Sequence, residues 1–335
     1  MENRERAESG QKAESGQKTG SGQKTESGQK TESGQKAGNG QEEERMKIAV
    51  VVDSNSGVTQ KEAKELGLFV LPMPFMIDGE EYFEGITLTH EEFYRRLAAD
   101  SEISTSQPAP GAVTALWDQL LEEYDGIVHI PMSSALSSSC QTARLLAEDY
   151  EGRVQVADNR RIATTQRQSA LDALALARKG LDAAAIRERL EQTGGDSSIY
   201  LTVDTLRYLK KGGRITPAAA ALGTLLRLKP VLTIQGGKLD AFGRARTMKQ
   251  AKSMMSSAVA RDMETRWNDT TGAGTNLQIV YSCSEELAEE LAAELEQQFP
   301  QVSAPIFKAP VPMSIACHTG PGVLAITAVK ITDLG

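Results

Sequence analysis

Residues 46–53 read Met-Lys-Ile-Ala-Val-Val-Val-Asp. The run of branched apolar side chains in this stretch is typical of a β-strand that is buried on both faces. Two similar runs follow, at 126–130 and 154–158. Helical periodicity separates the three strands, at 90–99, 111–121 and 138–149. Because strands and helices alternate, the sequence predicts a first domain over 46–160 of the α/β class, with a parallel sheet.

The second half of the chain has a different pattern. Residues 161–192 are rich in alanine and leucine and predict helix up to the breaker Gly194-Gly195. Further strands are predicted at 199–203, 230–234, 277–281, 303–307 and 323–329, with a helix at 285–299. We therefore expect an α+β second domain over 161–335.

The amino-terminal residues do not have the composition of a folded domain. Residues 7–41 repeat a six-residue unit such as AESGQK or TESGQK, without any aromatic or branched apolar side chain. A segment with nothing to bury cannot offset the entropy of ordering. Residues 1–45 are therefore predicted to be a disordered tail.

Composition excludes several classes of function. The net charge of -8 and the pI of about 5.2 argue against a nucleic-acid partner. No apolar run approaches the roughly 20 residues that cross a bilayer, so we expect a cytoplasmic protein without stable membrane insertion. Cysteines and histidines are few and scattered: Cys140, Cys283, Cys317, His90, His129 and His318. This spacing predicts no metal site.

Polar clusters follow the three predicted strands of the first domain, at 53–56, 133–139 and 158–159, and a fourth lies at 104–111. Loops at the carboxyl ends of parallel strands meet in one crevice, although hydroxyls near helix starts often only cap the helix. Candidate lining residues from these clusters are Ser54, Ser106, Ser134 and Asp158. Together such hydroxyls could hold an anion with neutral donors.

The motifs of catalysis and nucleotide binding are missing from the sequence. There is no G-x-S-x-G elbow, no G-x-x-x-x-G-K-[ST] loop and no G-x-G-x-x-G after the first strand. In the second half, 208–215 combines two lysines with paired glycines, and 318–322 places a histidine before two glycines. Taken alone, these features could be solvated charge and helix stops.

In order along the chain, six segments resemble the DegV family: Asp53-Ser54, STSQP at 104–108, SSALS at 133–137, YLKKGGRI at 208–215, KPVL at 229–232 and HTGPG at 318–322. The resemblance runs from Met46 to about Lys330. It departs from the family at Ala135 and Ser138, where glycine is usual, and alanine tolerates positive φ poorly.

The resemblance implies a non-catalytic, two-domain protein that buries a long-chain fatty acid and uses no cofactor. It also implies a partner, the separate catalytic subunit of a fatty acid kinase, and hence a place in phospholipid metabolism. Thr105 and Ser137 are expected to contact the carboxylate, and Arg214 and His318 to belong to the head-group network. Two alternatives are a serine-dependent acyl hydrolase or transferase that uses Ser137 with His318, and a regulatory protein that senses lipid.

Overall fold

In the computed structural model, which describes residues 46–99, 101–222, 228–282 and 284–331, four parallel strands form a first sheet. In spatial order they are β2 (Phe69–Leu71), β1 (Ile48–Asp53), β6 (Gly126–Ile130) and β7 (Val154–Val156). All residues of β1 and β6 are buried, as expected for strands covered on both faces. The predicted parallel sheet is confirmed.

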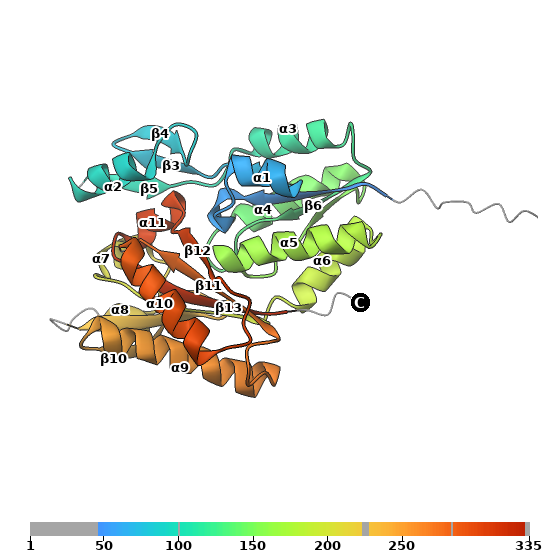
Figure 1. Cartoon of the computed structure of the whole chain (residues 1–335). Helices are drawn as coiled ribbons and strands as arrows, with labels where there is room; N and C mark the ends of the chain where they lie inside the picture. Colours follow the sequence, from blue (N-terminus) through green and yellow to red (C-terminus); the bar gives the residue numbers. More distant parts are fainter. Residues whose placement is uncertain (1–45, 100, 223–227, 283, 332–335) are drawn as a thin grey trace, which may run out of the picture. The chain divides into compact units, whose positions relative to one another are not determined.

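Helices cover both faces of this sheet (Figure 1). They are α1 (Gln60–Leu66), α3 (Pro110–Leu120), α4 (Ser139–Ala147), α5 (Thr164–Arg178) and α6 (Ala183–Gln192), with single 3-10 turns at Ser54–Ser56 and Glu148–Tyr150. Alternate side chains of β1 point to opposite faces. Val50 and Val52 pack with residues of α1, α5 and α6, whereas Ala49 and Val51 pack with residues of α3 and α4.

Three short antiparallel strands of the described chain form a separate small sheet that the sequence did not predict. They are β4 (Glu80–Phe83), β3 (Pro74–Ile77) and β5 (Ile103–Thr105), and α2 (His90–Ala98) packs on them. Phe93 of α2 meets Phe75 of β3 edge to face, with ring centroids 5.6 Å apart. Strands of three or four residues are too short to show a clear alternation of apolar side chains.

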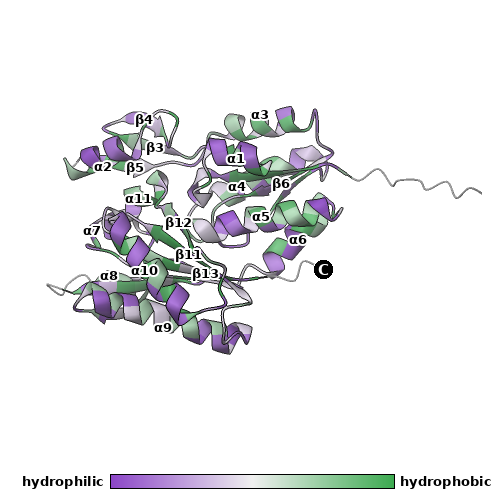
Figure 2. Cartoon of the chain, in the orientation of Figure 1, coloured by the Kyte–Doolittle hydropathy of each residue, from purple (hydrophilic) through white to green (hydrophobic). Residues whose placement is uncertain are grey.

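Within the described residues, six strands form the second sheet. Their order is β10 (Asp240–Ala245), β9 (Lys229–Ile234), β8 (Ser197–Thr202), β13 (Leu324–Lys330), β11 (Thr275–Tyr281) and β12 (Phe307–Pro310). All neighbours are antiparallel except β11 and β12. Figure 2 shows β11 and β13 in the green of apolar residues.

The remaining helices are α7 (Arg207–Gly212), α8 (Pro217–Leu222), α9 (Met248–Trp267), α10 (Glu285–Gln298) and α11 (Met313–Thr319). Residues of α9 and α10 form one apolar cluster with the second sheet. One predicted strand was displaced: β12 begins at Phe307, not at 303. Pro305 has no N–H to donate to a ladder, which accounts for the late start.

Helix α5 contacts strands of both sheets. At its start, the hydroxyls of Thr164 and Thr327 are hydrogen bonded at 2.7 Å, which ties α5 to β13. The helices predicted after residue 160 thus also pack on the first sheet, and the domain boundary at 160 stays a prediction. Residues 1–45 lie outside the described residues, so the predicted disordered tail is not tested. Across the part that is described, no helix combines the length and apolarity that a membrane span requires.

Candidate functional site

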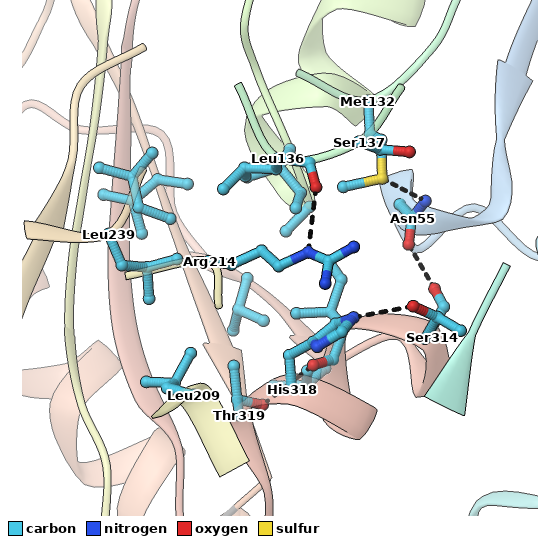
Figure 3. A pocket seen from close by; sticks show the side chains of 18 of the residues that line it. Asn55, Met132, Leu136, Ser137, Leu209, Arg214, Leu239, Ser314, His318 and Thr319 are labelled. Atoms are coloured by element: carbon cyan, nitrogen blue, oxygen red, sulfur yellow. Dashed lines mark hydrogen bonds between the residues drawn. The ribbon is translucent and has the colours of Figure 1, made fainter. Parts of the chain in front are cut away.

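A cavity of about 240 Å³ lies where the ends of the first sheet, the small sheet, α11 and the second sheet meet (Figure 3). Its polar lining is Asn55, Thr105, Ser106, Gln107, Ser137, Ser138, Arg214, Ser314, His318 and Thr319, and Thr327 adds a hydroxyl on the second sheet. The sequence-predicted residues Thr105, Ser106, Ser137, Arg214 and His318 are therefore brought together, although they come from four separate segments of the chain.

Strands of the second sheet supply one part of the apolar wall. Apolar lining residues include Met73, Met132, Leu136, Ile162, Ile199, Leu201, Ile234, Leu239, Val280, Val323 and Ala325. Ala325 pairs with Leu201 on one side and Val280 on the other, so these three side chains share one face of the sheet. The cavity thus joins a broad apolar surface to a cluster of hydroxyl, amide and guanidinium groups.

Thr105 and His318 are hydrogen bonded to each other, with Thr105 Oγ1 2.9 Å from His318 Nε2. Thr105 ends β5 and His318 lies in the last turn of α11, so the bond connects the small sheet to α11. Burial, together with the nearby positive charge of Arg214, lowers the pKa of His318 to about 4. The imidazole is therefore neutral near pH 7.

Two glycines of the predicted motifs allow α7 and α11 to approach each other closely. A Cβ added to Gly212 would lie 2.3 Å from Nδ1 of His318. A Cβ on Gly320 would lie 2.3 Å from Cδ2 of Tyr208, and Gly320 has a φ of +72°. The paired-glycine and His-Thr-Gly motifs are therefore explained by one contact, which positions the ring of His318.

Ser137 precedes α4 in the loop after β6. Its Oγ accepts a hydrogen bond from the backbone N–H of Ser139 at 3.2 Å, which leaves the hydroxyl proton available to a ligand. The two departures from the family do not strain this turn. Ser138 has a φ of -81°, and Ala135 is not among the described residues with a positive φ.

Arg214 extends into the cavity, and its guanidinium lies near the ring of His318 (Figure 3). Its Nε donates to the carbonyl oxygen of Leu136 at 3.3 Å, and its Nη1 donates to that of Gly212 at 2.5 Å. The guanidinium therefore links the loop of Ser137 to the end of α7. It also places a positive charge beside the hydroxyls.

Three of the predicted lining residues do not line the cavity. Ser54 accepts a hydrogen bond from the backbone N–H of Met73 at 3.0 Å and so positions a lining residue from behind. Asp158 accepts from the backbone N–H of Ser134 at 3.3 Å, so these two residues stabilise the loop after β6. The three residues lie in loops that follow the parallel strands β1, β6 and β7, as predicted, but only some side chains of these loops line the cavity.

The sequence analysis did not identify Asn55 and Ser314 as site residues. Asn55 follows β1 in the 3-10 turn, and Ser314 lies four residues before His318 on α11, so Ser314 and His318 share a helix face. Ser314 Oγ donates a hydrogen bond to Asn55 Oδ1. The spacing of Ser314 and His318 was the available signal, but the short helix that gives it meaning was not predicted.

Ser137 and His318 are not arranged as a nucleophile and its general base. His318 Nε2 is bonded to Thr105, and Nδ1 faces the backbone of Gly212. An imidazole whose pKa is lowered to about 4 is also a weak base near pH 7. Among the described residues, no three His, Cys, Asp or Glu side chains gather as a metal site would require.

Comparisons with known proteins all identify the same family. The family model described as "Uncharacterised protein, DegV family" matches residues 47–330. A DegV domain-containing protein of Listeria monocytogenes is 31% identical over 287 residues, which cover 84% of this chain and 98% of that protein. One from Deinococcus radiodurans is 35% identical over 217 residues, covering 64% and 77% respectively.

Solved structures give the same result. A Thermus thermophilus structure described as showing fatty acid binding of a DegV family protein has a TM-score of 0.77 and 31% identity, and the match covers 85% of this chain and all of that chain. DegV of Bacillus subtilis, described as a fatty acid binding protein, has a TM-score of 0.74 and 27% identity, covering 85% and 99%.

Proposed function

Because this chain belongs to the DegV family, we propose that it binds a long-chain fatty acid in the cavity, with the carboxylate at Thr105 and Ser137 and the acyl tail against the second sheet. The observation that carries the proposal is the division of one cavity into a polar and an apolar part. The fatty acid binding described for the Thermus and Bacillus proteins supports it.

The acyl tail supplies most of the affinity. Burial of an apolar chain is worth about 0.8 kcal/mol for each methylene, so roughly fifteen methylenes give a gross gain of about 12 kcal/mol before the costs of association. Ile199, Leu201, Ile234, Val280 and Ala325 offer the wall that such a chain needs.

The polar part of the cavity holds the head group. A buried carboxylate is costly unless its lost hydrogen bonds to water are replaced. Ser137 has a hydroxyl proton to give, and Thr105 has one as well when His318 donates to it from Nε2. Arg214 adds positive charge without occupying the position of the tail.

The protein then presents the carboxylate to a separate acyl kinase and does not transform it. A carboxylate oxygen is already a nucleophile and needs no general base when it attacks the γ-phosphoryl group of ATP. That attack forms an acyl phosphate and releases ADP, and the kinase supplies the magnesium and the charge stabilisation. The expected cytoplasmic location stays a prediction that accompanies this role.

Ligand binding tests the first part of the proposal. Protein stripped of lipid should bind oleate in isothermal titration calorimetry, and organic extracts of protein purified from cells should contain fatty acids by mass spectrometry. Ser137→Ala and Thr105→Ala should each weaken oleate binding about tenfold, since each removes a hydrogen bond to a charged group. Ser134→Ala, in the same loop but outside the cavity, should bind as the unaltered chain does. If the unaltered chain neither carries nor takes up an acyl chain, the proposal is wrong.

A hydroxylamine assay tests the second part, because hydroxylamine traps acyl phosphates as hydroxamates. The oleate-loaded protein with ATP and magnesium should give no hydroxamate alone, and should give it when an acyl kinase of a DegV-containing bacterium is added. Hydroxamate formed without the kinase would show that this chain is itself an enzyme. If several active kinases give no hydroxamate, the proposal that this chain presents the carboxylate is wrong, but the proposal that it binds a fatty acid is not affected.

A further inference from the structure

Two hydrogen-bonded pairs of side chains connect α11 to the polar end of the cavity. His318 pairs with Thr105, and one helical turn earlier Ser314 pairs with Asn55 (Figure 3). Both Asn55 and Ser314 line the cavity. The second pair is deeply buried, since Asn55 is 1% and Ser314 6% exposed.

The bonds of Asn55 fix which way its amide points. Oδ1 accepts from the hydroxyl of Ser314, and Nδ2 lies 3.0 Å from the sulfur of Met132. The reverse orientation would place the amide oxygen against the sulfur, which cannot donate to it. The two N–H donors of Asn55 are therefore directed to the side of the cavity where Met132 and Ser137 lie (Figure 3).

The acceptor that Asn55 Nδ2 contacts is a weak one. A thioether sulfur is a weak hydrogen-bond acceptor, and Met132 Sδ is the acceptor that the described residues offer to Nδ2. A buried amide donor without a good acceptor loses about 1 to 3 kcal/mol relative to one that is satisfied. A carboxylate oxygen is a much stronger acceptor.

We propose that Asn55 is a third neutral donor to the carboxylate, beside Thr105 and Ser137: its Nδ2 leaves the sulfur of Met132 and donates to a carboxylate oxygen of the bound ligand, while Ser314 holds the amide in the donating orientation. This inference rests on the proposed function. It adds a specificity: three neutral donors, from Asn55, Thr105 and Ser137, select a planar carboxylate over an alcohol with the same tail.

The test compares oleate with oleyl alcohol, which has the same tail and no carboxylate, by calorimetry on lipid-free protein. Asn55→Leu keeps the volume and removes the donors. It should weaken the binding of oleate about tenfold and change the dissociation constant of oleyl alcohol less than about threefold. Equal weakening of both ligands, or no weakening of oleate, would overturn the inference. Failure of the unaltered chain to bind oleate would instead contradict the proposed function.

Ser134→Ala is the control, because Ser134 lies near Ser137 in the chain but does not line the cavity. It should bind oleate and oleyl alcohol as the unaltered chain does. A tenfold loss of oleate binding in this variant would mean that the effect does not depend on the donors of Asn55 and would overturn the inference. If Asn55→Leu does not fold, a crystal structure of the oleate complex decides: Nδ2 within about 3.2 Å of a carboxylate oxygen supports the inference, and a longer distance refutes it.

Discussion

Replacing Gly212 by alanine should weaken the proposed fatty acid binding even though Gly212 lies at the end of α7 and does not line the cavity. The added Cβ would lie 2.3 Å from Nδ1 of His318, whereas ordinary contacts begin at 3.4 Å. The imidazole therefore has to move by about 1 Å. The structure predicts that this movement breaks the 2.9 Å hydrogen bond between His318 and Thr105.

The expected magnitude follows from that bond. Thr105 without its partner no longer has a fixed hydroxyl, and a hydrogen bond to a charged group is worth about 1.5 to 3 kcal/mol. The dissociation constant for oleate should therefore rise about 10-fold to 150-fold. Helix propensity alone predicts the opposite sign for folding, because alanine in a helix is about 0.5 to 1 kcal/mol more favourable than glycine.

The assay is isothermal titration calorimetry with oleate on lipid-free protein, together with thermal unfolding. Gly195→Ala is the matched control, since nothing lies within 4 Å of a Cβ at that position. It should leave the dissociation constant unchanged. If Gly212→Ala also binds oleate within about twofold of the unaltered chain, the ring of His318 does not position Thr105, and this reasoning is wrong.

Two further predictions concern the buried histidine of the first sheet and the wall of the cavity. Burial lowers the pKa of His129 to about 3, and neither ring nitrogen has a hydrogen-bond partner among the described residues. Below pH 6.5 the unfolded chain therefore takes up a proton at this side chain that the folded chain does not. The contribution of His129 to stability is complete above pH 6.5 and falls by about 2 to 3 kcal/mol as pH falls from 7 to 4.5. His129→Phe, followed by urea unfolding at both pH values, should remove that part of the pH dependence, and an unchanged slope would contradict the cause. Ala325→Leu adds side-chain volume to the cavity wall between Leu201 and Val280. It should weaken the binding of oleate more than tenfold and the binding of the shorter dodecanoate less, and equal losses of affinity in calorimetry would exclude an acyl tail at this wall.

Much of the fold could be predicted from the sequence because its central strands are long and apolar. The run at 48–53 and the run at 126–130 are buried on both faces, so their composition alone identifies them. The small sheet could not be found in this way. Its strands are three or four residues long, and β4 is exposed or half-buried, so no pattern of apolar residues distinguishes them from loops.

The site was predictable where motifs mark it and not where orientation decides it. Thr105, Ser137 and His318 stand in segments that resemble the family, and the cavity brings them together. Ser134 and Asp158 stand in similar loops, but neither lines the cavity, and the carboxylate of Asp158 instead accepts from the backbone N–H of Ser134. Direction within a turn depends on backbone angles and on neighbours from distant segments, such as α11, which a linear sequence does not display.

The position of β13 determines when the cavity is complete. This strand is the last of the described chain, yet it lies between β8 and β11 in the middle of the second sheet. Until it has been synthesised and inserted, β8 and β11 have no ladder between them, and the wall formed by Val323, Ala325 and Thr327 does not exist. If the cavity holds a fatty acid as proposed, a polypeptide that still lacks β13 could not load it, and loading would be a late event in biogenesis.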